Sequence, residues 1–385
     1  IAPASYSSVT ITPTANVTVS GNIAGALVKL NGADNVTING LLAGTRQLTF
    51  NNTNASSAAV VMWLACASAA DGATNNAIRN CNINGATLTT TLAGIASSGI
   101  TLGSVAETAN ANNTYENNSI TTAQYGIAVV GPSVMETGTI IRGNLIGSTT
   151  PANKIYFRGL FISNQQNISV TQNTIRGVAF ASGSGLNQGS GIYVVGAISG
   201  GSIDRNSISD VTVVSFWGCN GIQLNSSTAN TGLVIANNFI YDIAAGGWTS
   251  FDSVDDNGTG IAVNSGGGYN IWYNSINLTT NQSSGITAAI WFSTDVSLAT
   301  LNIRNNIFAN SQTTGTRYSI YSNSANTIFS SINYNDYYTT GAAIGFMLTT
   351  SYATLANWQS ATGQDANSVN IIPNFTSTTD LHLLG

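Results

Sequence analysis

Two aspartates recur at equivalent positions in the second half of the chain, where their carboxylates could do chemistry as a pair. Asp210 follows Ile208 by two residues, and Asp242 follows Ile240 by two residues. If the two segments stack as neighbouring strands, the carboxylates lie about 5 Å apart and the pKa of one of them rises. Such a pair is suited to general acid–base catalysis. The alternative is that each aspartate bonds nearby backbone amides at a turn, and we favour it.

The segment 241–260 is the longest well-defined insertion between strand signals. Loops of this length often carry function. Carboxylates are ligands that Ca²⁺ prefers, and an aromatic ring can stack on a sugar. The spacing matches no EF-hand, so we favour a solvated acidic loop over a metal site. The residues concerned are the calcium candidates Asp252, Asp255 and Asp256 and the ligand-binding candidates Trp248 and Phe251.

Aromatic residues are concentrated in the same region. Trp272 occupies an outward position that holds Arg or Glu elsewhere in the chain, so we expect it on the surface as a third ligand-binding candidate. An exposed strip of aromatic side chains can bind carbohydrate or dock a partner. For most of the neighbouring aromatic residues we expect packing in the core. The sequence predicts no cofactor apart from the calcium alternative.

A short pattern recurs along nearly the whole chain and must position these residues. An apolar residue is followed by asparagine three positions later and by another apolar residue two positions beyond. The interval between successive repeats varies from 26 to 42 residues and averages about 33, the length of one solenoid turn. Cys81 replaces asparagine in one repeat. The asparagines of this column are Asn39, Asn118, Asn144, Asn173, Asn206, Asn238, Asn274, Asn306 and Asn335.

Alternating apolar residues within each short segment indicate strands. A second apolar pair also recurs once per repeat, as in Val60/Met62, Ile100/Leu102 and Ile192/Val194. Two strand columns at fixed phase, with no helical pattern between them, mean that equivalent strands stack in parallel on the next coil. The sequence therefore predicts an all-β fold, a right-handed single-stranded parallel β-helix of about ten coils.

The asparagine column has a physical explanation within this fold. Asparagine tolerates left-handed backbone geometry at a sharp bend. Its amide can also bond the same amide one coil away, about 4.8 Å along the axis. We expect such a ladder to satisfy polar groups that the bend buries. The alternative is a row of ligand-binding amides.

The composition restricts the possible partners. Only 6% of the residues are charged and the net charge is −5, so no basic stripe exists to bind nucleic acid. No apolar run approaches the roughly 18 residues that a membrane span needs. The three cysteines, Cys66, Cys81 and Cys219, make no disulfide framework, and we expect buried free thiols.

The last 35 residues differ from the repeats. We expect residues 1–350 to form the coils and residues 351–385 to form a cap within the same domain. Tyr352, Leu355 and Trp358 are spaced by three residues and Gly363 follows, which predicts a short capping helix. Residues 370–375 and 380–384 have the pattern of closing strands. A cap is needed because exposed strand edges promote aggregation.

The two ends of the chain resemble a known group of proteins. The run SYATLANWQSATGQDANSVNIIPNFTSTTDLHL resembles the closing segment of secreted bacterial right-handed β-helix repeat proteins of the pectate-lyase-like superfold. The run VTVSGNIAGALVKLNGADNVTINGL resembles their entry coils. This resemblance implies export and an extracellular or cell-surface location. It also implies that the present chain is a processed segment of a longer precursor.

Enzymes of this superfold, as the resemblance implies, cleave acidic polysaccharides by calcium-assisted elimination or by hydrolysis with clustered aspartates. A polysaccharide lyase or glycoside hydrolase is therefore one hypothesis, with Asp210, Asp242 or Asp252 beside Arg176 or Arg205.

We favour an extracellular structural or adhesion scaffold, because charge is low and no catalytic cluster converges. Its neutral Asn, Thr and Ser faces would contact glycans, other cell-surface components or further copies in a homo-oligomer, surface layer or fibre. Ice binding is a third class. It requires Thr-x-Thr pairs at a fixed phase, which the Thr10/Thr12, Thr87/Thr89 and Thr137/Thr139 pairs lack.

Overall fold

The computed structural model describes residues 1–180, 189–213, 218–248 and 257–385. The described chain is nearly all β, a parallel β-solenoid of about 10 turns with one short C-terminal helix, so the predicted fold class is confirmed. The chain divides into two compact units. Unit 1 comprises Ile1–Val178 and Val195–Gly201, and unit 2 comprises Ala179–Val194 and Ser202–Gly385.

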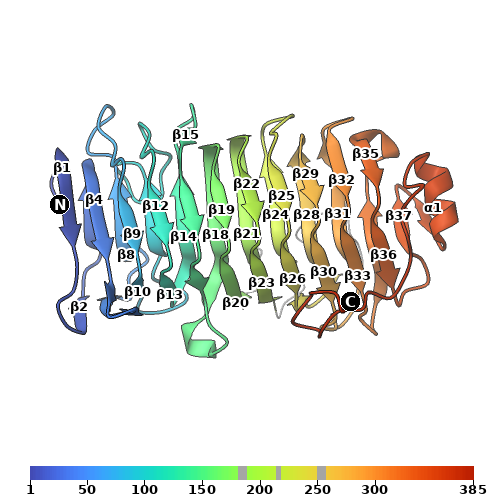
Figure 1. Cartoon of the computed structure of the whole chain (residues 1–385), viewed down its shortest axis with the longest axis horizontal. Coiled ribbons are helices and arrows are strands. Elements are labelled where there is room, and N and C mark those ends of the chain that lie inside the picture. Colours follow the sequence, from blue (N-terminus) through green and yellow to red (C-terminus); the bar gives the residue numbers. More distant parts are fainter. Residues whose placement is uncertain (181–188, 214–217, 249–256) are drawn as a thin grey trace. The chain divides into compact units, whose positions relative to one another are not determined.

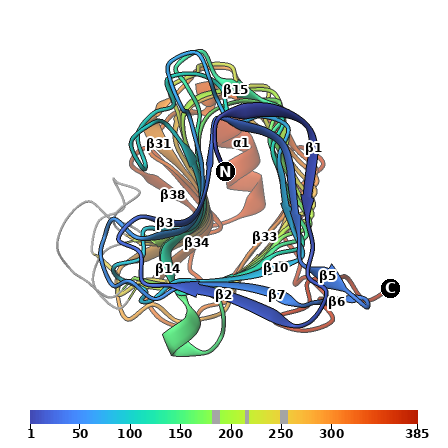
Figure 2. The same ribbon diagram turned by 90° about the vertical axis from the view of Figure 1, so that its left-hand side faces the viewer.

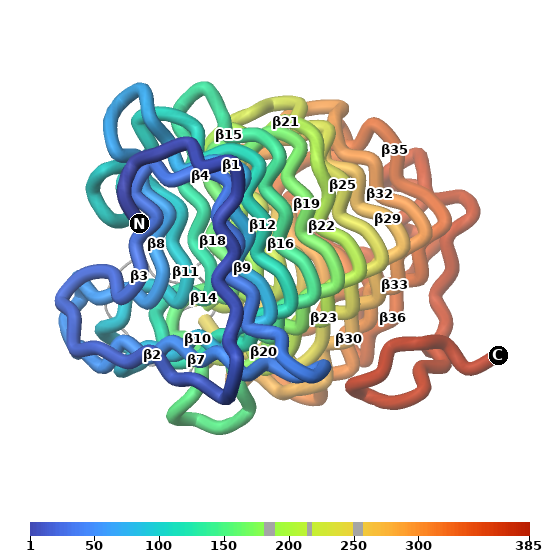
Figure 3. The backbone as a smooth tube through the Cα atoms, turned by 60° about the vertical axis from the view of Figure 1, so that its left-hand side comes forward, coloured from blue at the N-terminus to red at the C-terminus, as the bar shows by residue number. Residues whose placement is uncertain are grey.

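Unit 1 is built from three stacks of parallel strands, and each coil adds one strand to each stack. The first stack contains β1 (Ala4–Ile11), β4 (Ala33–Asn39), β9 (Ala77–Arg79), β12 (Thr114–Glu116), β16 (Ile140–Arg142) and β19 (Ser169–Thr171), side by side in that order (Figure 1). The second contains β2 (Val17–Gly21), β7 (Leu48–Asn52), β10 (Cys81–Asn84), β13 (Ser119–Thr121), β17 (Leu145–Ile146) and the start of β20 (Thr174–Phe180) (Figure 2). The third contains β3 (Ala26–Asn31), β8 (Val60–Ala65), β11 (Ala93–Ser98), β14 (Ala123–Val130) and β18 (Ile155–Gln166) (Figure 3).

Short excursions leave the coils of unit 1 at their corners. The antiparallel pair β5 (Leu41–Leu42) and β6 (Thr45–Arg46) forms a small hairpin (Figure 2). Strand β15 (Glu136–Thr137) pairs in parallel with the end of β18. A single 3-10 turn, η1 (Pro151–Asn153), precedes β18.

Unit 2 repeats the arrangement of three parallel stacks. The first contains β22 (Ser202–Asp204), β25 (Val234–Ala236), β29 (Asn270–Trp272), β32 (Leu301–Arg304) and β35 (Phe329–Asn333). The second contains β23 (Ser207–Val213), β26 (Phe239–Tyr241), β30 (Ser275–Leu278), β33 (Ile307–Asn310) and β36 (Asp336–Thr339), with β27 (Ile243–Ala244) beside β23. The third contains β24 (Cys219–Ser226), β28 (Gly258–Gly266), β31 (Ile286–Val296), β34 (Thr316–Ser322) and β37 (Gly345–Met347). Strand β21 (Gly189–Ser199) contributes residues to both units, and η2 (Asn326–Ile328) precedes β35.

The core of each coil is filled by apolar side chains that stack on their equivalents in the next coil. In unit 1, for example, Ile78 lies opposite Tyr115, and both are fully buried. At Gly94 the third stack approaches the second too closely to leave room for a side chain. A Cβ atom on Gly94 would lie 2.3 Å from the Cγ2 atom of Ile120. This close packing explains why a small residue precedes the apolar pair in most repeats.

The second apolar pair was wrongly assigned in two early coils. Met62 lies opposite Ile95, so the pairs that point inward are Met62/Leu64 and Ile95/Ser97. Ser97 is fully buried although it is polar. The alternation of apolar residues therefore does not reveal this pair in the sequence. Ile100 and Leu102 instead lie in the loop that follows β11.

The C-terminal cap consists of β38 (Thr350–Tyr352), which is antiparallel to β37, and the helix α1 (Leu355–Thr362). The Thr354 Oγ1 atom accepts a hydrogen bond from the Asn357 backbone, and Gly363 ends the helix with φ of 65°. The predicted capping helix is thus confirmed. The expected strands at 370–375 and 380–384 are absent from the described residues, where only an isolated bridge joins Phe375 to Leu383.

Candidate functional site

In unit 1 the asparagine side chains of three consecutive coils form a buried ladder of hydrogen bonds. The Asn118 Nδ2 atom donates to Asn144 Oδ1 at 3.1 Å, and Asn144 Nδ2 donates to Asn173 Oδ1 at 2.9 Å. The backbone N–H groups of Asn118 and Asn144 donate to the same oxygens. The ladder begins at Cys81, whose backbone N–H donates to Asn118 Oδ1 at 3.0 Å. These amides pair with one another and with backbone at a buried corner, so they do not form a ligand surface.

Unit 2 contains a ladder of the same design over five coils. The Nδ2 atom of each of the first four asparagines donates to the Oδ1 atom of the next one at 2.9 to 3.0 Å. The last member bonds to the cap, because the backbone N–H of Asn335 donates to Ser368 Oγ at 2.9 Å. The ladder therefore connects every coil of unit 2 to the C-terminal cap. Its members are Asn206, Asn238, Asn274, Asn306 and Asn335.

The left-handed backbone at this corner belongs to the residue before each ladder asparagine. Asn117, Asn237 and Asn305 have φ between 52° and 57°, and Tyr273 has φ of 56°. The expectation that the ladder asparagine itself is left-handed was wrong. The chain turns one residue earlier, which lets the next side chain point along the axis toward its equivalent.

Asn39 lies outside the ladder. It is opposite Arg79 rather than Cys81, and its Oδ1 atom accepts from Leu41 N at 3.2 Å and from Asn80 Nδ2 at 2.8 Å. The expected repeat is placed two residues too early in this coil. Ile38, rather than Val36, lies opposite Ile78 of β9.

Asp210 and Asp242 lie at equivalent positions of consecutive coils in unit 2. The flanking pairs are in register, since Ile208 is opposite Ile240 and Val211 is opposite Ile243. Both aspartates have left-handed backbone, with φ of 50° and 54°. The Thr280 hydroxyl donates to Asp242 Oδ1. Aspartate is one of the few residues that tolerates this backbone conformation, which gives both side chains a structural reason to be there.

Two of the predicted ligand-binding residues, Trp248 and Trp272, lie within the described structure. Trp248 is 47% exposed and follows β27, whereas Trp272 is half-buried on β29 of a different stack. Phe251, Asp252, Asp255 and Asp256 lie outside the described residues. Among the residues that the structure does describe, no group of three or more His, Cys, Asp or Glu side chains could hold a metal ion.

The three cysteines offer little reactivity. All are free and buried. Burial raises the pKa of the Cys66 thiol and raises that of Cys81 to about 12. Because the thiolate is the nucleophile and the metal ligand, these groups are inert at neutral pH.

An open groove lies on the second stack of unit 1, and none of the side chains that line it is charged. Its volume is about 590 Å³. The floor is a row of neutral side chains, one per coil, in which Asn51, Asn84 and Thr121 lie in register. The groove is lined by Asn51, Asn52, Thr53, Asn84, Gly85, Ala86, Thr121, Thr122, Ala152 and Asn153.

The floor residues of this amide groove hold one another in place. Asn84 Nδ2 donates to Asn51 Oδ1 at 2.8 Å, and the Thr121 hydroxyl donates to Asn84 Oδ1 at 2.8 Å. All three side chains are half-buried. The turn η1 supplies one wall through Ala152 and Asn153. Fixed amides and hydroxyls at the spacing of the coils can exchange hydrogen bonds with a hydroxyl-rich, uncharged ligand. No separate sequence signal marks this groove, because its residues resemble the other Asn and Thr positions of the repeats.

Glu136 is a buried carboxyl group that the sequence pattern did not reveal. Its Oε2 atom accepts from the Asn110 backbone N–H at 3.1 Å, and its Oε1 atom accepts from the Thr139 hydroxyl at 3.0 Å. The side chain is fully buried in unit 1, near the hydroxyl group of Tyr115. Burial raises the pKa of Glu136 to about 7.

Unit 1 is expected to lose stability as the pH rises from about 5 to about 8. The pKa of Glu136 is higher in the folded state than in the unfolded chain, so its contribution is complete below the unfolded value of 4.5 and is lost as the pH rises through about 7. The loss amounts to as much as about 3 kcal/mol. Urea unfolding at a pH of about 5 and at a pH of about 8 measures this loss of stability. Glu136→Gln should remove most of this dependence, and an unchanged dependence in that variant would contradict the assignment.

No protein-family model matches the chain, and no curated protein matches it. Among solved structures, it is similar to the A-module of mannuronan C-5 epimerase AlgE6 from Azotobacter vinelandii, with 13% identity and a TM-score of 0.44 over 96% of this chain and 90% of that chain. A tailspike protein mutant of E. coli bacteriophage HK620 has 12% identity and a TM-score of 0.37, over 94% of this chain and 74% of that one. The catalytic domain of a GH87 α-1,3-glucanase has 12% identity and a TM-score of 0.36, over 95% and 64%. Similarity at this level transfers no activity to the chain.

Two further predictions concern location. None of the helices in the described part of the chain is long and apolar enough to cross a membrane. Export to the cell surface stays a prediction from the resemblance.

Proposed function

We propose that this protein is an extracellular, non-catalytic β-solenoid scaffold that binds uncharged glycans along the amide groove of unit 1. The observation that supports this proposal is the row formed by Asn51, Asn84 and Thr121, whose side chains are preordered by hydrogen bonds and lie one per coil. None of the described residues that line the groove is charged. An ionic ligand would find no counter-charge there, whereas sugar hydroxyls both donate to and accept from amides.

The spacing of the coils also supports a polymeric ligand. Neighbouring strands lie about 4.8 Å apart, which is close to the length of one pyranose unit in an extended chain. A glycan that runs across the strands would therefore place successive sugars over successive coils. Each contact contributes little, but several equivalent contacts on a rigid floor add up without a large ordering penalty.

Asn84→Ala is expected to weaken the binding of a neutral oligosaccharide about tenfold, equivalent to about 1.4 kcal/mol. The substitution removes the central amide of the floor and releases both of its neighbours. Titration calorimetry against a panel of neutral and acidic oligosaccharides measures the effect. Asn82→Ala is the matched control, because Asn82 is on the same strand but does not line the groove. If no neutral glycan binds, or if both variants weaken binding equally, the proposal is wrong.

The same panel tests the enzymatic alternative. We propose that Asp210 and Asp242 stabilise the corner of the coil rather than cleave a glycosidic bond, because both occupy left-handed positions. Incubation with and without Ca²⁺ should therefore release no new chain ends from any polysaccharide. Turnover by the parent protein that Asp242→Ala abolishes would instead establish a hydrolase or lyase.

A further inference from the structure

A second hollow lies on the outer face of the third stack of unit 1. The outward side chains of β8, β11, β14 and β18 are in register, with Trp63 opposite Ala96, Ala96 opposite Ala128 and Ala128 opposite Phe161. Two consecutive alanines thus separate two aromatic residues. Their small side chains leave a space that larger residues would fill.

This space is a cavity of about 160 Å³, which we call the alanine pocket. Ala96 and Ala128 lie in its lining together with Leu92. The rings of Tyr125 and Phe161 also line it, with centroids 5.7 Å apart in an edge-to-face arrangement. The lining is therefore mostly apolar.

The Ser98 hydroxyl in the lining already accepts two hydrogen bonds. The Ser98 Oγ atom accepts hydrogen bonds from Trp63 Nε1 at 2.9 Å and from Gly103 N at 3.1 Å. A ligand in the alanine pocket would therefore gain more from apolar contact than from hydrogen bonds.

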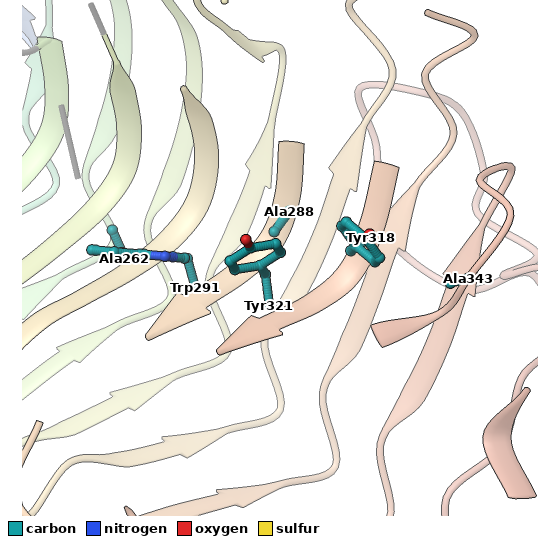
Figure 4. Packing of buried hydrophobic residues seen from close by; sticks show 6 residues of the cluster. All are labelled: Ala262, Ala288, Trp291, Tyr318, Tyr321 and Ala343. Atoms are coloured by element: carbon teal, nitrogen blue, oxygen red, sulfur yellow. The ribbon is translucent and has the colours of Figure 1, made fainter. Parts of the chain in front are cut away.

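The last three coils of unit 2 show how side chains can fill the equivalent positions. The equivalent outward residues of β31, β34 and β37 are Trp291, Tyr321 and Phe346. They lie in register with one another. The rings of Tyr321 and Phe346 stack with centroids 4.3 Å apart and planes 10° from parallel. Figure 4 shows Trp291 and Tyr321 within this buried cluster. In these three coils the outward column is thus packed with flat rings of the chain itself, whereas Ala262 and Gln223 occupy the column in the two preceding coils.

We propose that the alanine pocket of unit 1 binds one uncharged, six-membered aromatic ring, which takes the place of the side chain that Ala96 and Ala128 do not supply. Two observations support this identity of the ligand. Apolar cavities of about 150 Å³ accept a single benzene ring. The edge-to-face pair of Tyr125 and Phe161 provides aromatic surface for such a ring. The proposal does not depend on the amide groove.

Phenol is a suitable probe for the alanine pocket. Myo-inositol is the negative control, because it is a six-membered ring of similar size with a hydroxyl on every carbon. In the parent protein, phenol should bind saturably with a dissociation constant below about 1 mM, within the affinity that so small a ligand can reach. The methyl resonances of Ala96 and Ala128 should shift through the ring current, which locates the ligand. Myo-inositol should cause no saturable shift. Absence of phenol binding would overturn the proposal.

Ala128→Phe fills the alanine pocket with a ring of the chain's own. The variant should bind phenol at least tenfold more weakly than the parent and should keep or raise its melting temperature. Ala70→Phe, at an exposed turn position of unit 1 that lines neither hollow, is the matched control and should leave phenol binding unchanged. Phe161→Leu replaces one aromatic wall of the alanine pocket with an uncharged aliphatic side chain and leaves Ala96 and Ala128 unchanged. This variant should also bind phenol more weakly than the parent. Unchanged phenol binding in Ala128→Phe and Phe161→Leu would contradict the proposal.

Discussion

Replacing Trp358 with alanine is expected to lower the free energy of unfolding of unit 2 by about 4 kcal/mol, the loss that follows removal of a large buried aromatic side chain. Trp358 is fully buried in the cap. Its ring contacts Gly345, where an added Cβ atom would lie 2.8 Å away, and it meets the ring of Tyr352 edge to face. The side chain therefore closes the last coil of unit 2.

The loss extends beyond packing, because Trp358 belongs to a polar network. Its Nε1 atom donates to Asp365 Oδ2 at 2.8 Å, and the Tyr337 hydroxyl donates to the same oxygen at 2.9 Å. Burial raises the pKa of Asp365. Without the indole, this buried carboxyl loses one of its donors, which adds to the destabilisation.

Denaturant unfolding followed by circular dichroism measures the effect of Trp358→Ala. Trp248→Ala is the matched control, because Trp248 is about half exposed in the same unit. The control should change the free energy of unfolding by less than about 1 kcal/mol. We also expect Trp358→Ala to aggregate at concentrations where the parent does not, since it uncovers a strand edge. Equal stability of the two variants would show that the cap does not hold the last coil.

Asn274→Ala is expected to destabilise unit 2 by about 3 to 5 kcal/mol, because several buried polar groups lose their partners at once. Asn274 Nδ2 donates to Ile235 O at 2.9 Å and to Asn306 Oδ1 at 2.9 Å. Its Oδ1 atom accepts from the side chain and the backbone of Asn238. In the alanine variant the Asn238 side-chain and backbone donors lose their acceptor and Ile235 O loses this donor, whereas Asn306 Oδ1 keeps the backbone N–H of residue 274.

The size of this effect distinguishes a ladder from a row of independent amides. Chemical denaturation of Asn274→Ala gives the free energy directly, and Asn374→Ala at an exposed position serves as the control. The double variant Asn274→Ala/Asn306→Ala should lose less than the sum of the two single variants, because the first substitution already breaks the shared hydrogen bond. Strictly additive losses would mean that the amides do not act together.

The sequence revealed the fold for a specific physical reason. Each coil of a parallel solenoid places equivalent residues at equivalent depth, so the pattern of inward isoleucines and corner asparagines repeats along the chain. The helix that ends at Gly363 was also predictable, since its spacing and its C-cap glycine are local signals. By contrast, the corner geometry was misassigned by one residue, as the φ of Tyr273 shows, because a repeat spacing does not state which residue turns the chain.

What the sequence determined by itself was therefore the set of residues that repeat, and with them the strands, the coils and the cap. The tertiary structure alone decided which polar residues bond to one another and which face a hollow. Asn84 and Asn144 are the same residue type in similar patterns, yet one lies in an open groove and the other in a buried ladder. Likewise, nothing local marks Glu136 as buried or Ala128 as the floor of a pocket. Depth and exposure of a side chain depend on what the neighbouring coils and their loops place over it, and these neighbours lie about thirty residues away in the sequence.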